Sequence, residues 1–124
     1  MGVLVYEPAP TVTLDQLEDE LTRAFTLVRG ALLQGDAVVV SLDDRDLPGT
    51  RDIARAALAH GLLGLARALA LEGRKPGWRI TVLSSTPEVG RDERLSWIEQ
   101  LSDSAAARGA LVRLGGEHLG RLPA

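Results

Sequence analysis

The stretch Ala57–Ser84, ALAHGLLGLARALALEGRKPGWRITVLS, decides the fold that the sequence predicts. It starts within a long, almost wholly apolar segment, passes through a short basic turn with glycine and proline, and ends in a run of mostly apolar residues. A helix, a tight turn and a strand in this order are typical of an α/β protein with a parallel sheet. We therefore expect a long helix over Ile53–Glu72 and a strand over Arg79–Ser84.

The same alternation of strand and helix continues on both sides of that stretch. A helix is expected to begin at Thr13 and to stop at Gly35, because apolar residues recur at helical spacing and Thr13 with Gln16 fits a capping box. Three further strands are expected over Gly2–Tyr6, Ala37–Ser41 and Ala110–Leu114. A polar loop is expected over Leu42–Arg51 and a helix over Asp92–Arg108. That last helix would point Leu95, Ile98, Leu101 and Ala105 inward and end at Gly109.

These elements predict one α/β domain over residues 1–124, with a short parallel sheet of about four strands and three main helices. Ala37–Ser41 is apolar almost throughout, as in a strand that is covered on both faces. Right-handed crossovers that all run in one direction would nevertheless place every helix on the same face of the sheet. We therefore expect the opposite face to be poorly covered.

Composition excludes several classes of function. Hydrophobic residues make up 45 % of the 124 residues, which suits a globular domain with one core. The net charge is −3 and the basic residues form no run, so no nucleic-acid partner is expected. The absence of cysteine excludes disulfides, thiolate metal sites and cysteine nucleophiles. The N-terminus lacks the pattern of a signal peptide, so a cytoplasmic location is the expectation.

Ile53–Leu71 is the one segment whose length approaches the ~20 residues that a membrane span needs. It contains Arg55, His60 and Arg67, and much of its apolar character comes from alanine and glycine. Because charged side chains near the bilayer centre are costly, we expect no membrane association.

Taken in order, segments over nearly the whole chain resemble the second half of the short-chain dehydrogenase/reductase family. Gly64–Glu72, GLARALALE, is the most specific of them and is close to the usual end of the family's catalytic helix. The other segments are Val3–Ala9, Leu21–Leu33, Ala37–Ser41, Arg79–Leu83 and Gly109–Gly116. The resemblance implies a truncated Rossmann-like fold that lacks the family's N-terminal dinucleotide-binding unit.

The resemblance also implies that the family's activity is lost. No glycine-rich dinucleotide loop is present, so no nicotinamide cofactor is expected. The position of the family's catalytic tyrosine is Arg55 and that of its lysine is Ala59. Its asparagine falls on about Glu20, and its serine on Leu42 or, with a shift of one residue, on Ser41.

Four polar residues are candidates for a remaining cleft: Glu7, Glu20, Ser41 and Arg55. Ser41 ends a predicted strand at the edge where α/β folds place their sites, although a hydroxyl that caps a loop is the more ordinary interpretation. Glu20 and Arg55 replace catalytic positions of the related family and are expected to face that cleft together. The alternative for this pair is a structural salt bridge.

Metal binding is not expected. Asp43, Asp44 and Asp46 could hold a divalent cation, but Arg45 interleaves them and the pattern favours a solvated charged loop. His60, inside the apolar helix, is expected to be a core or interface histidine with a hydrogen-bond partner, with a general base as the alternative. His118 is too far along the chain to form a metal site with it.

Small and apolar residues along the long helix predict an oligomer interface. The predicted contact residues are Ala57, Gly61, Leu62, Gly64, Leu65, Ala68 and Leu69. The sheet covers only one side of such a helix, and an exposed apolar patch usually marks an interface. In the related family this helix and the preceding one form a four-helix bundle at the dimer contact. Tight packing on the sheet is the alternative interpretation.

Three hypotheses of function follow. The first is a non-catalytic subunit that pairs with itself or with a full-length relative and supports or tunes a partner enzyme such as an active reductase. The second is a repurposed, cofactor-independent small enzyme or ligand-binding protein that uses the remaining cleft. The third is a surviving reductase, which would need a partner to supply the nucleotide site. The first strand is also expected to have an open edge that must be paired or covered.

Overall fold

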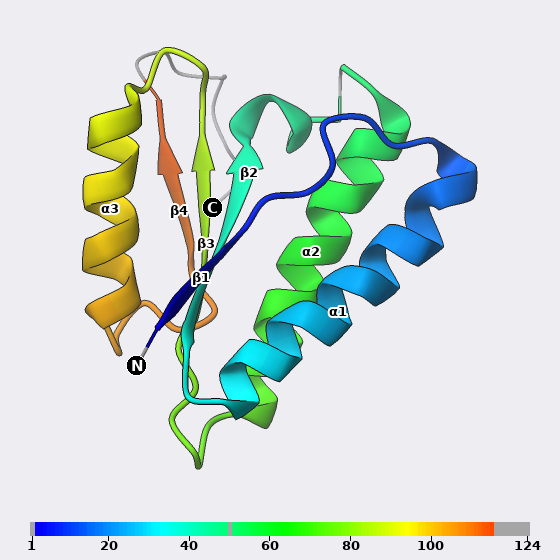
Figure 1. The fold of residues 1–124 in the computed structure, drawn as a ribbon. Helices are drawn as coiled ribbons and strands as arrows, with labels where there is room; N and C mark the ends of the chain where they lie inside the picture. The colour runs from blue at the N-terminus through cyan, green and yellow to red at the C-terminus, as the bar shows by residue number, and fades with distance from the viewer. Residues whose placement is uncertain (1, 50, 116–124) are drawn as a thin grey trace.

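Four parallel strands form the centre of the protein in the order β1-β2-β3-β4, and three α-helices connect them (Figure 1). The computed structural model describes residues 2–49 and 51–115. The strands are β1 (Val3–Tyr6), β2 (Ala37–Asp43), β3 (Ile80–Ser85) and β4 (Leu111–Leu114). The helices are α1 (Leu17–Leu33), α2 (Ile53–Glu72) and α3 (Arg91–Asp103), with 3-10 turns at Leu14–Gln16 and Asp44–Asp46. The predicted α/β class with a short parallel sheet is confirmed.

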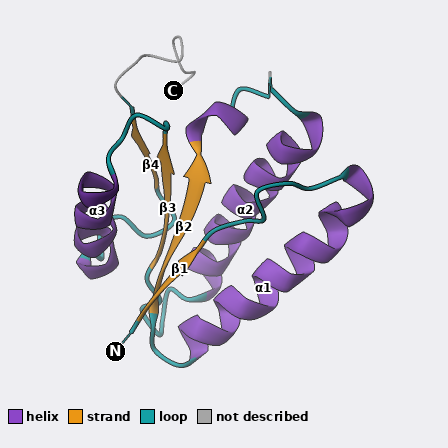
Figure 2. Cartoon of the chain, turned by 45° about the horizontal axis from the view of Figure 1, so that its top comes forward, coloured by secondary structure: helices purple, strands orange, loops and turns teal. Residues whose placement is uncertain are grey.

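The helices cover both faces of the sheet. Val38, Val40 and Val82 share a core with α1 and α2. The side chains that alternate with them along the strands, Val39 and Leu83, pack instead with α3. Figure 2 shows α3 on one side of the sheet with α1 and α2 on the other. The expectation that all helices lie on one face is therefore wrong for α3.

The direction of the chain explains this difference. Strand order continues from β3 to β4 in the same direction as before, while α3 has changed to the opposite face. The β3–α3–β4 crossover therefore has the opposite hand to the first two crossovers. Because crossovers are right-handed in almost all proteins, a prediction from the order of elements assigns one hand to all three.

β1 is only partly buried. It pairs with β2 through Val3↔Ala37 to Tyr6↔Val40, and its other edge has no strand partner among the described residues. Val3 is 50 % exposed and Val5 is 37 % exposed. Both side chains lie on the α3 face, where α3 packs over β2 and β3 and leaves β1 open.

α2 is the core helix of the larger layer. Among the described residues it is the one helix whose length and composition would allow it to cross a membrane. Its side chains Leu58, Leu62 and Leu69 are nevertheless buried in the core that α1, α2 and the sheet share. The bounds of α2 agree with the predicted helix, and its N-cap Asp52 accepts a hydrogen bond from the backbone of Arg55 at 3.0 Å.

α1 packs closely along α2. A Cβ atom placed on Gly61 of α2 would lie 2.8 Å from a methyl carbon of Leu21, so glycine is what allows this approach. At the other end of the pair, Arg29 binds Glu72 at 2.8 Å and its guanidinium lies 6.0 Å from the centre of the Trp78 ring. The predicted contact at the start of α1 is present, because the backbone N–H of Thr13 donates to the side chain of Gln16 at 3.1 Å.

α3 is shorter than predicted. It ends at Asp103, so Ala105 lies outside the helix, and Leu95 is exposed rather than inward. Ile98 and Leu101 do face the core as predicted. Gly109 is not the C-cap, because the helix ends at Asp103 and its C-cap is Ser104. Its φ is +70° and its N–H donates to the carbonyl of Ile80 at 2.7 Å, so it leads the chain into β4.

Candidate functional site

A polar cavity of about 330 Å³ lies at the carboxyl ends of the strands. Glu7 follows β1, Ser41 lies near the end of β2, and Ser85 and Thr86 end β3 and begin the next loop. Arg55 reaches the cavity from the first turn of α2 and Arg94 from α3. Ligands of α/β proteins bind at this edge of the sheet. The structure thus brings together Glu7, Ser41 and Arg55 of the predicted cleft residues.

Glu20 does not belong to this cavity. It lies in a separate hollow beside Ala9 and Gln16. Its carboxylate accepts a hydrogen bond from the hydroxyl of Tyr6 at 3.3 Å and lies 3.6 Å from Arg23. Burial, together with the charge of Glu20 and this hydrogen bond, raises the pKa of Tyr6 above its ordinary value. The expectation that Glu20 and Arg55 share a cleft or a salt bridge is therefore wrong.

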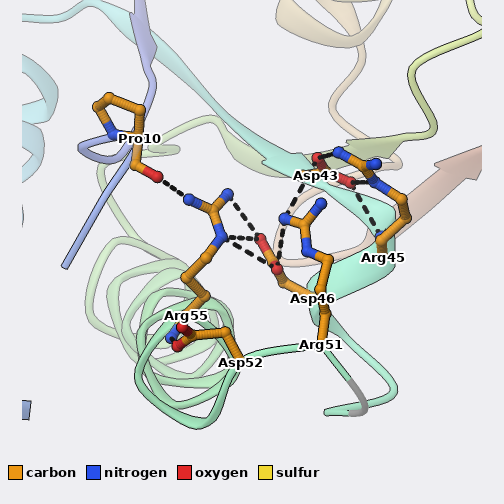
Figure 3. A network of polar contacts seen from close by, with 7 residues as sticks. All are labelled: Pro10, Asp43, Arg45, Asp46, Arg51, Asp52 and Arg55. Atoms are coloured by element: carbon orange, nitrogen blue, oxygen red, sulfur yellow. Dashed lines mark hydrogen bonds and ion pairs between the residues drawn. The ribbon is translucent and has the colours of Figure 1, made fainter. Parts of the chain in front are cut away.

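Arg55 is held by Asp46 instead (Figure 3). The Nε and Nη2 atoms of Arg55 lie 3.0–3.2 Å from the Asp46 carboxylate oxygens, and Nη1 donates to the carbonyl of Pro10. Arg51 binds the same carboxylate at 2.8 Å. The hydrogen bond to Asp46 raises the pKa of Arg55. Arg55 thus joins the start of α2 to two loops, and its charge is already compensated by a buried carboxylate.

The aspartate-rich loop is not solvated, which corrects the expectation for this segment. Asp44 and Asp46 are buried. Asp44 accepts a hydrogen bond from Ser84 at 2.7 Å and two from Arg113 at 2.6 and 2.8 Å. Asp43 is bound by Arg45 at 2.6 Å, and these hydrogen bonds lower the pKa of Asp43. Arginines therefore occupy the carboxylates, and no cluster of metal-ligand type is found among residues 2–49 and 51–115.

Hydroxyl groups line the wall of the cavity on the α3 side of the sheet. Ser41 and Ser85 are buried, and Asp43 and Ser85 are register partners across β2 and β3. Thr86 is only 3 % exposed, and its Oγ1 has no hydrogen-bond partner in the described part of the chain. Sequence reasoning missed Ser85, Thr86 and Arg94. The available signal was the Ser-Ser-Thr run directly after an apolar strand, at the edge where sites form.

His60 takes no part in this site. Nε2 of His60 lies 2.8 Å from the carbonyl oxygen of Leu47, to which it donates. His60 is an exposed residue with a hydrogen-bond partner rather than a core histidine. His118 lies outside the described residues.

The predicted interface residues divide into two groups. Leu62 and Leu69 are buried within the chain, at 0 % and 1 % exposed, so their assignment to a subunit interface is corrected. They face the sheet because they lie on the side of α2 opposite to Gly64. Gly64 and Ala68 are exposed, and Ala57, Gly61 and Leu65 are partly exposed.

Comparison with known proteins gives a fold and no family. No family model matches the chain, and neither does any curated protein. Eleven chains of solved structures match it, among them a variant of a Serratia marcescens short-chain dehydrogenase/reductase. The TM-score with that protein is 0.59 at 15 % sequence identity, over 94 % of this chain and 64 % of the other.

The chain has a Rossmann-like fold. At 15 % identity the likeness supports the architecture of the short-chain dehydrogenase/reductases and nothing of their chemistry. The chain spans 64 % of the length of the protein it resembles.

Proposed function

We propose that this protein is a non-catalytic, truncated relative of the short-chain dehydrogenase/reductases that works by association through α1 and α2. The partner is a second copy or a full-length relative, and the association supports or tunes an enzyme such as an active reductase. A cytoplasmic location is part of the proposal, and the inward packing of α2 supports it.

The observation that carries this proposal is a surface that we call the outer helix face. It consists of Phe25 of α1 with Ala57, Gly64, Ala68 and Leu71 of α2. The four α2 residues follow one another at intervals of seven, four and three over 57–71 and therefore form one stripe. Phe25 lies four residues after Leu21 and four before Arg29, both of which contact α2, so it borders that stripe. Phe25 is 45 % and Leu71 69 % exposed.

The outer helix face suits another pair of helices. Gly64 has no neighbouring atom within 4 Å of where a Cβ would stand, and Ala68 adds only a methyl group. Small residues let helices approach closely, and the flanking Phe25 and Leu71 supply apolar area to bury. Exposed apolar surface of this kind usually marks an interaction site.

The residues at the family's catalytic positions support a non-catalytic role. Arg55 stands at the tyrosine position, and its guanidinium is bound to Asp46 and Pro10. Ala59 stands at the lysine position and is buried in the core. Neither side chain can act as the proton donor that hydride transfer in that family requires.

Molar mass in solution, measured by light scattering, tests the proposal. We expect an oligomer of the chain alone, or a complex with a reductase when the chain is purified with its native neighbours. Ala68→Arg should abolish the association, because it places a charge in the middle of the outer helix face. Ser96→Arg is the matched control, since it adds the same side chain to an exposed position of α3 on the other side of the sheet. A monomer in both preparations, or equal association of both variants, would refute the proposal.

A second candidate function is a small ligand-binding protein or cofactor-independent enzyme. The cavity at the strand ends favours it, because it combines polar side chains from β2, β3, two helices and the segment after β1 at the usual site of this fold class. Glu7 would be the residue able to exchange a proton, since Asp43 and Arg55 are committed to partners. A ligand should raise the melting temperature of the wild type, and this rise, or any turnover, should be lost in Glu7→Gln. That loss would distinguish a ligand-binding or catalytic role from a purely structural one.

A further inference from the structure

We propose that the cavity at the strand ends binds a small anionic ligand, through a carboxylate or phosphate group, using Arg94, Thr86 and the first turn of α3. This inference rests on the second candidate function, ligand binding, and is independent of association through the outer helix face.

The charge of the cavity is the first argument. Arg45, Arg55 and Arg94 all line it. Arg45 is bound to Asp43 and Arg55 is bound to Asp46, so the charge of each is already compensated within the protein. Arg94 is partly buried, and its side chain has no hydrogen bond or ion pair to any residue in 2–49 or 51–115. A guanidinium in this setting is suited to bidentate binding of a carboxylate or phosphate.

The hydroxyl of Thr86 is the second, independent argument. It is buried in the cavity wall without a hydrogen-bond partner among the described residues, and such groups are rare because they lose their hydration without compensation. Its backbone is fixed, because its N–H donates to Leu114 at 3.1 Å and its carbonyl accepts from Val89 at 3.1 Å. An anionic oxygen in the cavity would accept a hydrogen bond from this hydroxyl once the side chain turns toward it.

The start of α3 is the third argument. Its N-cap is Gly90, so no side chain accepts hydrogen bonds from the first backbone N–H groups. Free N–H groups at a helix N-terminus attract anions. Pro87 and Arg94, three residues before and four after Gly90, both line the cavity, which places this terminus at its edge.

Two features of the cavity restrict the size of the ligand and the position of its charged group. A cavity of about 330 Å³ is at the lower end of the usual range for small-molecule sites, so a compact metabolite fits better than a dinucleotide. Glu7 on the β1 side of the rim opposes an anion, so the charged group should lie on the α3 side, beside Arg94.

Amide chemical shifts of the full chain, followed by NMR during titration, test the inference. Inorganic phosphate and acetate are used separately, so that the two arms distinguish a phosphate site from a carboxylate site. We expect saturable shifts at millimolar concentrations of at least one probe, centred on residues 85–94. Arg94→Gln should weaken binding about tenfold or more, because it removes a charge-assisted hydrogen bond.

Arg108→Gln is the matched control. It removes the same charge from an exposed residue at the opposite end of the sheet, directly before Gly109, and it should change binding by less than about twofold. Glu7→Gln should tighten binding, because it removes the opposing charge.

Thr86→Val provides a readout of the hydroxyl alone. Without ligand, this variant should melt at the same temperature as the wild type or higher, since a buried unpaired hydroxyl is removed. The rise in melting temperature caused by the effective probe should become smaller than in the wild type. An absence of shifts with both probes, or equal binding by Arg94→Gln and Arg108→Gln, would overturn the anion site. Either result would leave the light-scattering test of association unaffected.

Discussion

The two faces of the sheet are stabilised in different ways. On the α1/α2 face, Val28, Leu32, Leu62 and Leu69 are almost wholly buried and form one continuous core with the strands. On the α3 face the apolar core is small, with Val39 and Leu83 packed against Ile98 and Leu101. Toward the carboxyl ends the α3 face becomes polar, and the cavity opens there. One face therefore supplies most of the apolar burial, and the other leaves room for a ligand.

The largest expected effect on stability comes from shortening a side chain within the main core. Leu62→Ala should lower the free energy of unfolding by about 4 kcal/mol, because Leu62 is fully buried between two helices and the sheet. Leu101→Ala, at the end of α3, should cost about 2 kcal/mol, since that site lies at the edge of a small cluster. Urea unfolding of both variants measures the difference. Equal costs would show that the two faces are equally well packed.

The next effect concerns the ion pairs at the strand ends. Asp46→Asn should destabilise the protein by about 2 kcal/mol, because Arg51 and Arg55 lose a buried carboxylate. The cost is below that of a fully buried pair because both arginines are partly exposed. Urea unfolding measures it, with Asp36→Asn as a control at a carboxylate outside this network. If Asp46→Asn costs no more than its control, this network does not hold the loop.

The smallest effect is a dependence on pH. Arg45 holds the pKa of Asp43 below its ordinary value of 3.8. Because the pKa is lower in the folded state, the pair stabilises the fold above about pH 4, and this contribution disappears as the pH falls below that value. Unfolding between about pH 6 and pH 2 should therefore show a weaker loss of stability in Asp43→Asn than in the wild type. Parallel curves would mean that the pair contributes nothing in solution.

The sequence predicts the elements well and their partners poorly. The apolar run of α2 and the position of each strand are evident from hydrophobic patterning. The face on which α3 lies is not, because Val38, Val39 and Val40 are equally apolar and show no alternation. A strand buried on both sides carries no signal of which side each helix covers.

The site is harder still to predict. Asp44 and Arg113 are 69 positions apart, and only the parallel pairing of β3 with β4 brings them together. Arg55, one of the predicted cleft residues, lines the cavity at the strand ends, but its partner is Asp46 rather than Glu20. Thr86 stands out because its hydroxyl has no partner among the described residues, and the residue type alone does not indicate a missing contact.

The β3–α3–β4 crossover, whose hand is reversed, is also expected to be the part of the molecule that opens most easily. α3 is held mainly through Ile98 and Leu101, and every residue of β4 is only partly buried. Elements with so little buried apolar surface open locally before the rest of a domain. α3 and β4 should exchange their amide hydrogens faster than α1 and α2, so the wall that carries Arg94 can separate from Ser41 while the main core stays closed. Such a difference in exchange would show that the wall that carries Arg94 and the main core open as separate cooperative units.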